Sequence, residues 1–375
     1  MDNQTTRVVE IGAVNPGEIV SETVGSPGTS AEPGSNLTET SKGTSTNSEA
    51  KSIYELLEED IMASDTPDSE KTKRLSRLIK IRSKKVNIML VGSTGSGKSS
   101  TVNAMFNMDI AKVGVGVDPE TSDISKFELD NLIIWDTPGL GDGIDSDKRI
   151  TRDIVEKLNE VDEQNIPLID LVIVIMDASS KDMGTSCDLI NNVLIPCLGK
   201  DAESRILIGL NQSDIAMKGT HWDVDKNEPD EVLKTFLRKK AESVQKRIKD
   251  ATGLNIQPIC YCAGYKEDGG EQRSPYNLTK LLYHVVTMIP KDKRLALADN
   301  INSEANNWRY DDQEIDYRGE TKRGFCDTVW NCLSDGAETG SEIGGKILGI
   351  PGRIVGGVIG GAIGAIGGIF GAIFD

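Results

Sequence analysis

Short apolar runs alternate with longer amphipathic stretches between residues 86 and 290. Five runs have the length and composition of buried strands: Val86–Val91, Ile133–Trp135, Leu171–Met176, Ile206–Leu210 and Ile256–Tyr261. Four segments have helical spacing, near residues 145–165, 183–198, 230–251 and 275–289. This alternation predicts an α/β fold with a mostly parallel sheet that helices cover on both faces. Ligands of such sheets bind at the carboxyl ends of the strands.

Two helices are expected before the first strand. Ser52 and Glu55 have the spacing of a capping box, and the apolar residues of 53–61 then fall on one helical face. A second helix is expected to start near Pro67, with an apolar stripe of Leu75, Leu78 and Ile79. Its charges are all basic from residue 71 on: Lys71, Lys73, Arg74, Arg77, Lys80, Arg82, Lys84 and Lys85. This face is either a solvated surface packed on the main domain or a contact for an anionic membrane or RNA.

The two ends of the chain differ from the middle in composition. Residues 1–50 are polar, contain no aromatic residue and are expected to be a disordered tail. After Pro290 we expect a helix to about Trp308 and then a polar linker, Tyr310–Arg323. The predicted domains are a tail at 1–50, a basic helical extension at 51–85, the α/β domain at 86–290, a helix and linker at 291–335, and a glycine-rich tail at 336–375.

The C-terminal tail has an uncharged run of 21 residues, 354–374, with eight glycines. As a helix it would span roughly 30 Å, the thickness of a hydrocarbon core. Glycines recur every fourth residue and would form one groove: Gly352, Gly356, Gly360, Gly364 and Gly368. In water so many glycines disfavour an isolated helix. The run therefore predicts a membrane-inserted or membrane-associated segment within 340–375, the alternative being a tail packed on its own domain or oligomer.

Charge and cysteine usage exclude several classes of protein. A net charge of −17 argues against a general nucleic-acid binder, and no DNA partner is expected. The six cysteines show no paired metal-binding spacing, and His221 and His284, the only histidines, are given no catalytic role. The N-terminus has no secretory signal pattern, so we expect a cytoplasmic domain that the tail tethers at the inner membrane.

The strongest chemical signal is a phosphate-binding loop after the first strand. Gly92, Gly97, Lys98 and Ser99 have the G-x-x-x-x-G-K-[ST] spacing, between an apolar run and a helical one. Glycines let successive backbone N–H groups point at phosphate oxygens, and the following helix adds its positive end. Lys98 would reach the β- and γ-phosphates, and the Ser99 hydroxyl would ligate Mg²⁺. The candidate loop residues are Gly92, Ser93, Thr94, Gly95, Ser96, Gly97, Lys98, Ser99 and Ser100.

Three further stretches follow other predicted strands. Asp136 closes one strand and could hold Mg²⁺ through water, and Gly139 could offer its N–H to a γ-phosphate. Asn211, Gln212 and Asp214 follow a second strand, where a carboxylate could accept hydrogen bonds from guanine N1 and N2. Cys262 and Ala263 follow the last strand, where a backbone amide could meet guanine O6. At the carboxyl edge of one sheet these stretches would form a single site.

In this order the four stretches resemble the G1, G3, G4 and G5 motifs of the translation-factor-related GTPases. The resemblance covers about residues 86–290. Over this range the chain is similar to Era-like P-loop GTPases found in enteric bacteria, often on prophages, and its phosphate loop is similar to that of the septin/AIG1/Toc group. It implies GTP/GDP and Mg²⁺ as ligands. It also implies that Thr121 ligates the metal with Ser99 and Asp136, and that Lys98, Thr121 and Gly139 take part in catalysis.

Three departures from the family pattern bear on activity. Gln212 stands where the family commonly has Lys, so the charge beside the base is lost. Leu140 stands where Ras-like enzymes place a water-orienting Gln, and Gly95 stands where potassium-using relatives have Asn. Intrinsic hydrolysis should therefore be slow. Septin-type relatives pair their GTP domains, so help is expected from a homodimer or a partner, with Arg149 and Arg152 as weaker candidates.

The sequence thus predicts a GTPase that acts as a molecular switch at a membrane. A first alternative is a non-hydrolysing, GTP-dependent membrane scaffold, which Leu140 favours. A second is an Era-like ribosome-assembly factor. Only the basic helix at 71–85 supports it, and no KH-like Gly-x-x-Gly module follows the GTPase domain. An ATPase is a third.

Overall fold

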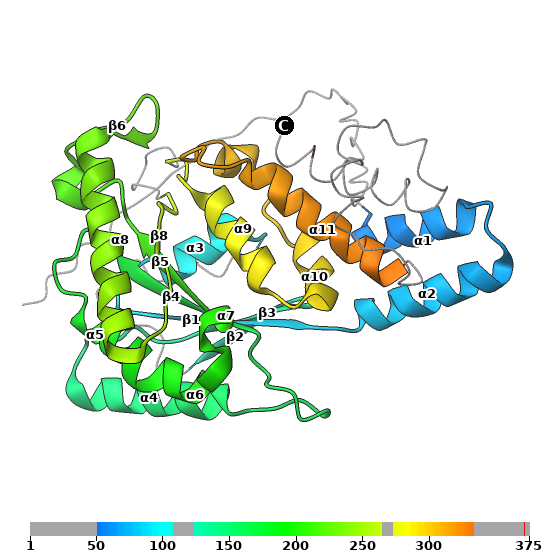
Figure 1. The fold of residues 1–375 in the computed structure, drawn as a ribbon, viewed down its shortest axis with the longest axis horizontal. Coiled ribbons are helices and arrows are strands. Elements are labelled where there is room, and N and C mark those ends of the chain that lie inside the picture. The colour runs from blue at the N-terminus through cyan, green and yellow to red at the C-terminus, as the bar shows by residue number, and fades with distance from the viewer. Residues whose placement is uncertain (1–50, 108–123, 265–272, 334–370, 372–375) are drawn as a thin grey trace, which may run out of the picture. The chain divides into compact units, whose positions relative to one another are not determined.

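The computed structural model describes residues 51–107, 124–264 and 273–333, together with Gly371. Its centre is a six-stranded sheet in the order β2-β3-β1-β4-β5-β8 (Figure 1). β2 pairs antiparallel to β3, and the other neighbours are parallel. The strands are β1 Val86–Gly92, β2 Ser125–Leu129, β3 Leu132–Asp136, β4 Leu171–Asp177, β5 Ile206–Asn211 and β8 Ile259–Cys260. The predicted sheet is confirmed, although its last strand is shorter than the apolar run Ile256–Tyr261.

Alternate residues of the central strands pack into two separate hydrophobic clusters. In β1, Ile88 and Leu90 join the cluster under α3, α9 and α11, whereas Met89 and Val91 join the cluster under α4 and α8. Both faces of β1 are therefore dry, which is why its sequence is apolar without alternation. The longer helices around the sheet are α3 Lys98–Met105, α4 Ile144–Leu158, α8 Glu231–Thr252, α9 Leu278–Met288 and α11 Tyr317–Leu333.

Short elements complete the described chain. The segment predicted as one helix at 183–198 consists of α5 Gly184–Leu189, a π-helical turn η1 Ile190–Leu194 and α6 Ile195–Leu198. The helix predicted near 145–165 ends at Leu158. The remaining short elements are η2 Gly199–Asp201, α7 Ala202–Arg205, η3 Ala216–Gly219, β6 Trp222–Asp223, β7 Glu228–Pro229, η4 Lys291–Lys293, α10 Leu295–Ala298 and η5 Ala305–Trp308.

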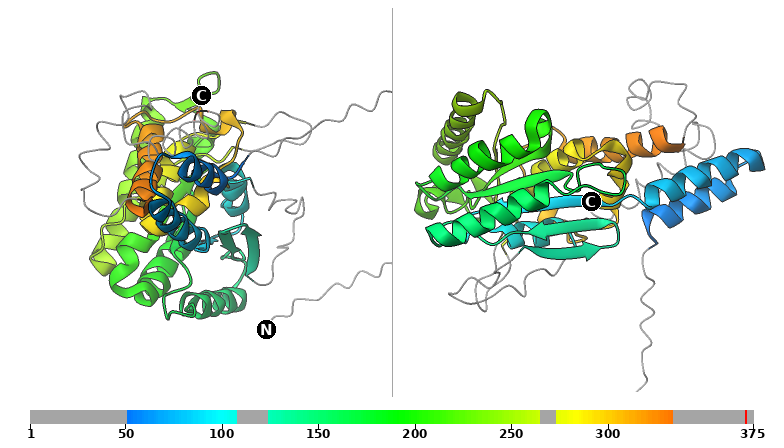
Figure 2. Two further views of the ribbon diagram at one scale, coloured as in Figure 1. Left: turned by 90° about the vertical axis from the view of Figure 1, so that its right-hand side faces the viewer. Right: turned by 90° about the horizontal axis from the view of Figure 1, so that it is seen from below.

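The N-terminal extension forms two helices, α1 Ile53–Ala63 and α2 Asp68–Arg82, which lie side by side (Figure 2). The predicted capping box is present: Ser52 Oγ accepts from Glu55 N, and the Glu55 carboxylate accepts from Ser52 N. Apolar residues of α1 are fully buried in the main core, so this extension is part of the folded unit.

The predicted apolar stripe of α2 is wrong at one position. Ile79 is 68% exposed, whereas Leu78 is buried as predicted and Ile81 is buried in place of Ile79. At 3.6 residues per turn, Ile79 is rotated by about 160° from Ile81, so the two cannot share a buried face. Helix α2 packs against α1 and α11, and Leu78 and Ile81 are the apolar residues that it buries.

The region after Pro290 also differs from expectation. Short turns and α10 replace the helix predicted to run to Trp308. The second half of the predicted linker Tyr310–Arg323 is the start of α11, which packs beside α9 (Figure 1). Phe325 and Val329 of α11 are fully buried. Polar residues of this segment were read as a solvated linker, but they form ion pairs within the folded unit: Lys280 Nζ lies 2.7 Å from both Asp312 Oδ2 and Glu314 Oε2.

Within the described residues, no helix is both long and apolar enough to cross a membrane. The uncharged run at 354–374 lies outside those residues, Gly371 excepted, and its membrane contact stays a prediction.

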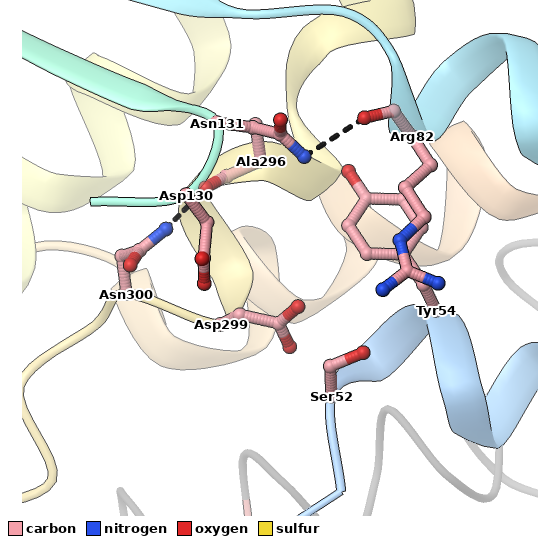
Figure 3. A pocket seen from close by; sticks show the side chains of 8 residues that line it. All are labelled: Ser52, Tyr54, Arg82, Asp130, Asn131, Ala296, Asp299 and Asn300. Atoms are coloured by element: carbon pink, nitrogen blue, oxygen red, sulfur yellow. Dashed lines mark hydrogen bonds between the residues drawn. The ribbon is translucent and has the colours of Figure 1, made fainter. Parts of the chain in front are cut away.

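A polar cavity of about 220 Å³ lies where α1, α2, α10 and the β2–β3 turn meet (Figure 3). It is lined by Ser52, Tyr54, Arg82, Asp130, Asn131, Ala296, Asp299 and Asn300. Asn131 Nδ2 donates to the Arg82 carbonyl at 2.9 Å, and Ile53 N donates to Asp299 Oδ1 at 2.6 Å. Burial raises the pKa of Asp299 to about 6, a shift that the Ile53 N–H and Arg82 oppose and that Asp130 and Glu55 reinforce.

We expect Asp299 to make the protein more stable as the pH falls from 7 to 5. A carboxyl group whose pKa is raised in the folded state binds a proton more tightly there than when unfolded, so protonation favours folding. Because the cavity is polar and open to water, the effect should be about 1 kcal/mol. Urea denaturation of the wild type and of Asp299→Asn at both pH values checks this: the variant should lack the increment, and the exposed control Asp225→Asn should keep it. An equal increment in Asp299→Asn would contradict the prediction.

Candidate functional site

The loop between β1 and α3 has the geometry of a phosphate cradle. Gly97, the N-cap of α3, has a left-handed backbone with φ 87°. A Cβ atom at Gly97 would lie 2.2 Å from Asn211 Nδ2, so glycine is required for space as well as conformation. The loop and the start of α3 lie at the carboxyl end of β1, as the motif predicts.

Lys98 lies over this loop with its ammonium group largely buried. Lys98 Nζ donates to the carbonyls of Gly92, at 3.3 Å, and Ser93, at 3.2 Å. Burial lowers the pKa of Lys98, whereas the nearby carboxylates of Asp136 and Asp142 oppose that shift. A cation held by two carbonyls rather than by an ion pair is well placed to exchange these contacts for phosphate oxygens.

Ser99 and Asp136 meet beside Lys98. Ser99 Oγ donates to Asp136 Oδ2 at 3.1 Å, and the other carboxylate oxygen, Oδ1, is buried without a hydrogen-bond partner. Burial raises the pKa of Asp136, with Lys98 and the Ser99 hydroxyl opposing the shift. A buried, unsatisfied carboxylate oxygen next to a hydroxyl is a donor set that suits Mg²⁺ or a water molecule bound to it. The residues present therefore fit the metal that the sequence predicts.

The chain after Asp136 runs along the phosphate loop. Leu140 N donates to the Gly92 carbonyl and Thr94 N donates to the Leu140 carbonyl, both at 3.1 Å. A Cβ at Gly139 would lie 2.2 Å from Thr94 Oγ1, so only glycine allows this approach. The Leu140 side chain is 4% exposed and packs in the hydrophobic cluster with Met89 and Val91. It therefore points into the core and away from the loop.

Asn211 connects the phosphate loop to the predicted base-binding loop. Asn211 Nδ2 donates to the Ser96 carbonyl at 3.0 Å, and Ala263 N donates to Asn211 Oδ1 at 3.0 Å. The next residue, Gln212, has a left-handed backbone, and its Nε2 donates to the Gly95 carbonyl at 2.7 Å. A neutral amide thus makes the contact with the loop where the family commonly has Lys.

Asp214 and Cys262 lie together at the other end of this connection. Both are buried, and their loops are joined by a hydrogen bond from Ser213 N to the Tyr261 carbonyl at 3.2 Å. Burial raises the pKa of the Cys262 thiol, and the adjacent Asp214 carboxylate raises it further. A neutral thiol beside a carboxylate leaves Asp214 as the negative group of this loop.

The structure brings most of the predicted site residues to one edge of the sheet. The phosphate loop, Asp136, Gly139, Asn211, Gln212, Asp214, Cys262 and Ala263 lie at the ends of β1, β3, β5 and β8. Thr121 lies outside the described residues, and Ser100 is exposed on α3. His221 pairs with Asp230 at 2.7 Å, and the described residues contain no group of three or more potential metal ligands among His, Cys, Asp and Glu. Ligand binding by these residues stays a prediction.

Two features of the site were missed by sequence reasoning. Thr94 Oγ1 donates to Asp142 Oδ2 at 2.7 Å, and Tyr261 and Thr101 share a buried hydroxyl contact at 2.7 Å. The signal for Asp142 was its place between Gly141 and Gly143, directly after the Asp136–Leu140 motif. Nothing in the sequence pairs Tyr261 with Thr101, because 160 residues separate them.

We expect Asn211→Ala to lower the free energy of unfolding by about 3 kcal/mol, since it leaves the Ser96 carbonyl and the Ala263 amide buried without partners. The matched variant Gln212→Ala removes one exposed hydrogen bond to the same loop and should cost about 0.5–1 kcal/mol. Urea denaturation of both variants measures the difference. Equal losses would show that Asn211 does not hold the two loops together.

Two curated relatives match part of this chain. The mouse mitochondrial 5-taurinomethyluridine-[tRNA] synthase subunit GTPB3 is 27% identical over 139 residues, which are 34% of this chain and 26% of that protein. The rat protein of the same name is 26% identical over 173 residues, or 44% of this chain and 33% of that protein. The chain thus spans a quarter to a third of the length of these relatives.

Several solved structures are similar to this chain. A dimerization-deficient mutant of Toc33 from Arabidopsis thaliana has a TM-score of 0.38 and 18% identity, and covers 65% of this chain and 98% of its own. LeoA, a bacterial dynamin GTPase from ETEC, has a TM-score of 0.38 and 16% identity, and the match covers 65% of this chain and 44% of LeoA. A probable GTP-binding protein engB has a TM-score of 0.33 and 15% identity, and the match covers 54% of this chain and 98% of engB.

A family model described as 50S ribosome-binding GTPase matches residues 87–212. The match runs from β1 through the phosphate loop and Asp136 to Gln212 in the loop after β5. It covers most of the predicted nucleotide contacts, whereas Asp214 and Cys262 lie beyond it. Together with the strand order of the sheet, this match shows that the α/β unit has the fold of a P-loop GTPase G domain.

Proposed function

We propose that this protein binds guanine nucleotides with Mg²⁺ and hydrolyses GTP to GDP and phosphate with slow intrinsic turnover. The observation that carries the proposal is the Asn211 amide, which joins the loop around Lys98 to the loop that presents Asp214. A phosphate site and a carboxylate suited to guanine N1 and N2 are thereby held in one frame.

Each residue has a task that follows from its position. Lys98 and the loop amides would stabilise negative charge on the β- and γ-phosphates, and Gly139 N–H would meet the γ-phosphate. Ser99 Oγ and Asp136 would hold the metal, with Thr121 as a further ligand. Mg²⁺, when bound, neutralises charge on the phosphate oxygens during attack by water. Gln212 would lay its aliphatic stem beside the base.

Slow turnover is proposed because the Leu140 side chain is buried. It can neither orient water nor accept a proton, and its place in the core keeps it from the phosphates. A second copy of the G domain could supply the missing catalytic group in a homodimer. The alternative is that the protein is a GTP-dependent scaffold that does not hydrolyse GTP. Turnover per molecule measured at several protein concentrations separates the two: a rate that rises with concentration supports a hydrolysing homodimer, and a flat rate near background supports the scaffold.

The site of action is a second part of the proposal. Membrane contact through 340–375 rests on the uncharged run at 354–374. The basic helix α2 leaves two alternatives open, since Lys73 and Lys80 are exposed: a contact with anionic lipid, or with RNA in an Era-like role at the ribosome. The large negative net charge makes the ribosomal role the weaker alternative.

Guanine recognition is tested by Asp214→Asn. We expect the variant to bind GDP about 100-fold more weakly, because an amide cannot accept both guanine donors, and to gain affinity for xanthine nucleotides, whose C2 carbonyl accepts from the new N–H₂ group. Calorimetry with Mg²⁺ measures both, and the exposed control Asp225→Asn should behave as wild type. The proposal fails if the wild type ignores guanine nucleotides, or if ATP displaces bound GDP as well as GTP does.

A further inference from the structure

Asp142 lies at the mouth of the phosphate loop in a defined position. Its Oδ2 accepts from Thr94 Oγ1 at 2.7 Å. The preceding residue is also fixed, because Gly141 N donates to Asp147 Oδ1 at 2.9 Å, and the backbone of Leu140 pairs with the loop on both sides. The carboxylate therefore stands beside Thr94 because the chain on either side of it is held there.

This position is on the side of the loop that faces a γ-phosphate. Gly139 packs against Thr94, and the Gly139 N–H is the group that in the proposed function meets the γ-phosphate. The negative charge of Asp142 also reaches Lys98: burial lowers the pKa of Lys98, and Asp142 opposes that shift. An exposed carboxylate thus stands where a triphosphate would bring further negative charge.

A γ-phosphate and the Asp142 carboxylate would compete for the Thr94 hydroxyl and for the positive charge of Lys98. The Thr94 hydroxyl has one hydrogen to donate, so it can serve the carboxylate or a phosphate oxygen but not both. Two anions at the same loop also repel each other, and Lys98 must neutralise both. GDP ends one phosphate earlier and leaves the Thr94–Asp142 contact intact.

We infer that the negative charge of Asp142 sets the preference of this site between GDP and GTP, favouring GDP. The inference rests on the proposed binding of guanine nucleotides. In this reading Asp142 is a specificity-determining residue: GTP binds only after its γ-phosphate has displaced the carboxylate from Thr94, whereas GDP binds without that cost.

The test compares the affinities of full-length variants for GDP and for a non-hydrolysable GTP analogue with Mg²⁺. Asp142→Asn keeps an oxygen that can accept from Thr94 and removes only the charge. We expect its affinity for the GTP analogue to rise about tenfold, with GDP affinity unchanged within about twofold, as exposed charges interact modestly in water. Asp142→Ala removes charge and hydrogen bond together and should shift the ratio at least as far.

Asp145→Asn is the matched control, because Asp145 lies three residues away on α4, is fully exposed and carries the same charge. Its ratio of GDP to GTP-analogue affinity should equal that of the wild type. An equal shift in Asp145→Asn, or a shift in Asp142→Ala without one in Asp142→Asn, overturns the role of the Asp142 charge. Unchanged ratios in all variants that bind both nucleotides overturn it as well. Absence of nucleotide binding by the wild type instead defeats the proposed function.

Discussion

The hydrogen bonds of the Asn211 side chain are the constraint on which the site depends. One buried amide donates to the Ser96 carbonyl and accepts from Ala263 N, so it fixes the phosphate loop relative to the base loop. Gly97 has no side chain, which leaves room for that amide. Because both partners are buried, neither can be satisfied by water if the amide moves. The distance between the two halves of the site is therefore set before any ligand arrives.

The core beneath the site supports this frame with a second chain of contacts. The Thr101 hydroxyl donates to the Gly97 carbonyl at 2.7 Å and meets the Tyr261 hydroxyl at 2.7 Å. The Tyr261 ring lies against Gly209, where a Cβ would approach Tyr261 Cε1 to 2.7 Å. Helix α3, β5 and the end of β8 are thus joined under the loops by groups that are almost completely buried. Gly97 and Gly209 leave the space that the side chains of Asn211 and Tyr261 occupy.

Sequence patterns predicted the sheet and the loop because both follow from short-range rules: apolar runs bury, and glycines before a lysine bend around phosphate. They failed where packing between distant segments decides. Tyr310–Arg323 reads as a linker, yet α11 begins at Tyr317, and Asp312 and Glu314 just before it pair with Lys280 of α9. The stripe of α2 was misplaced by Ile79, and Asp142 was overlooked, since its partner Thr94 lies 48 residues away. Burial of Leu140 likewise depends on residues of another strand.

The β2–β3 hairpin joins two places that the sequence separates. At one end β3 carries Asp136 beside Ser99, and at the other the hairpin turn holds Asn131, which donates to the Arg82 carbonyl at the end of α2. Five residue pairs in continuous antiparallel register connect these ends. Because the ladder is continuous, a shift of Asp136 along its strand would also move Asn131 and strain its hydrogen bond to the end of α2.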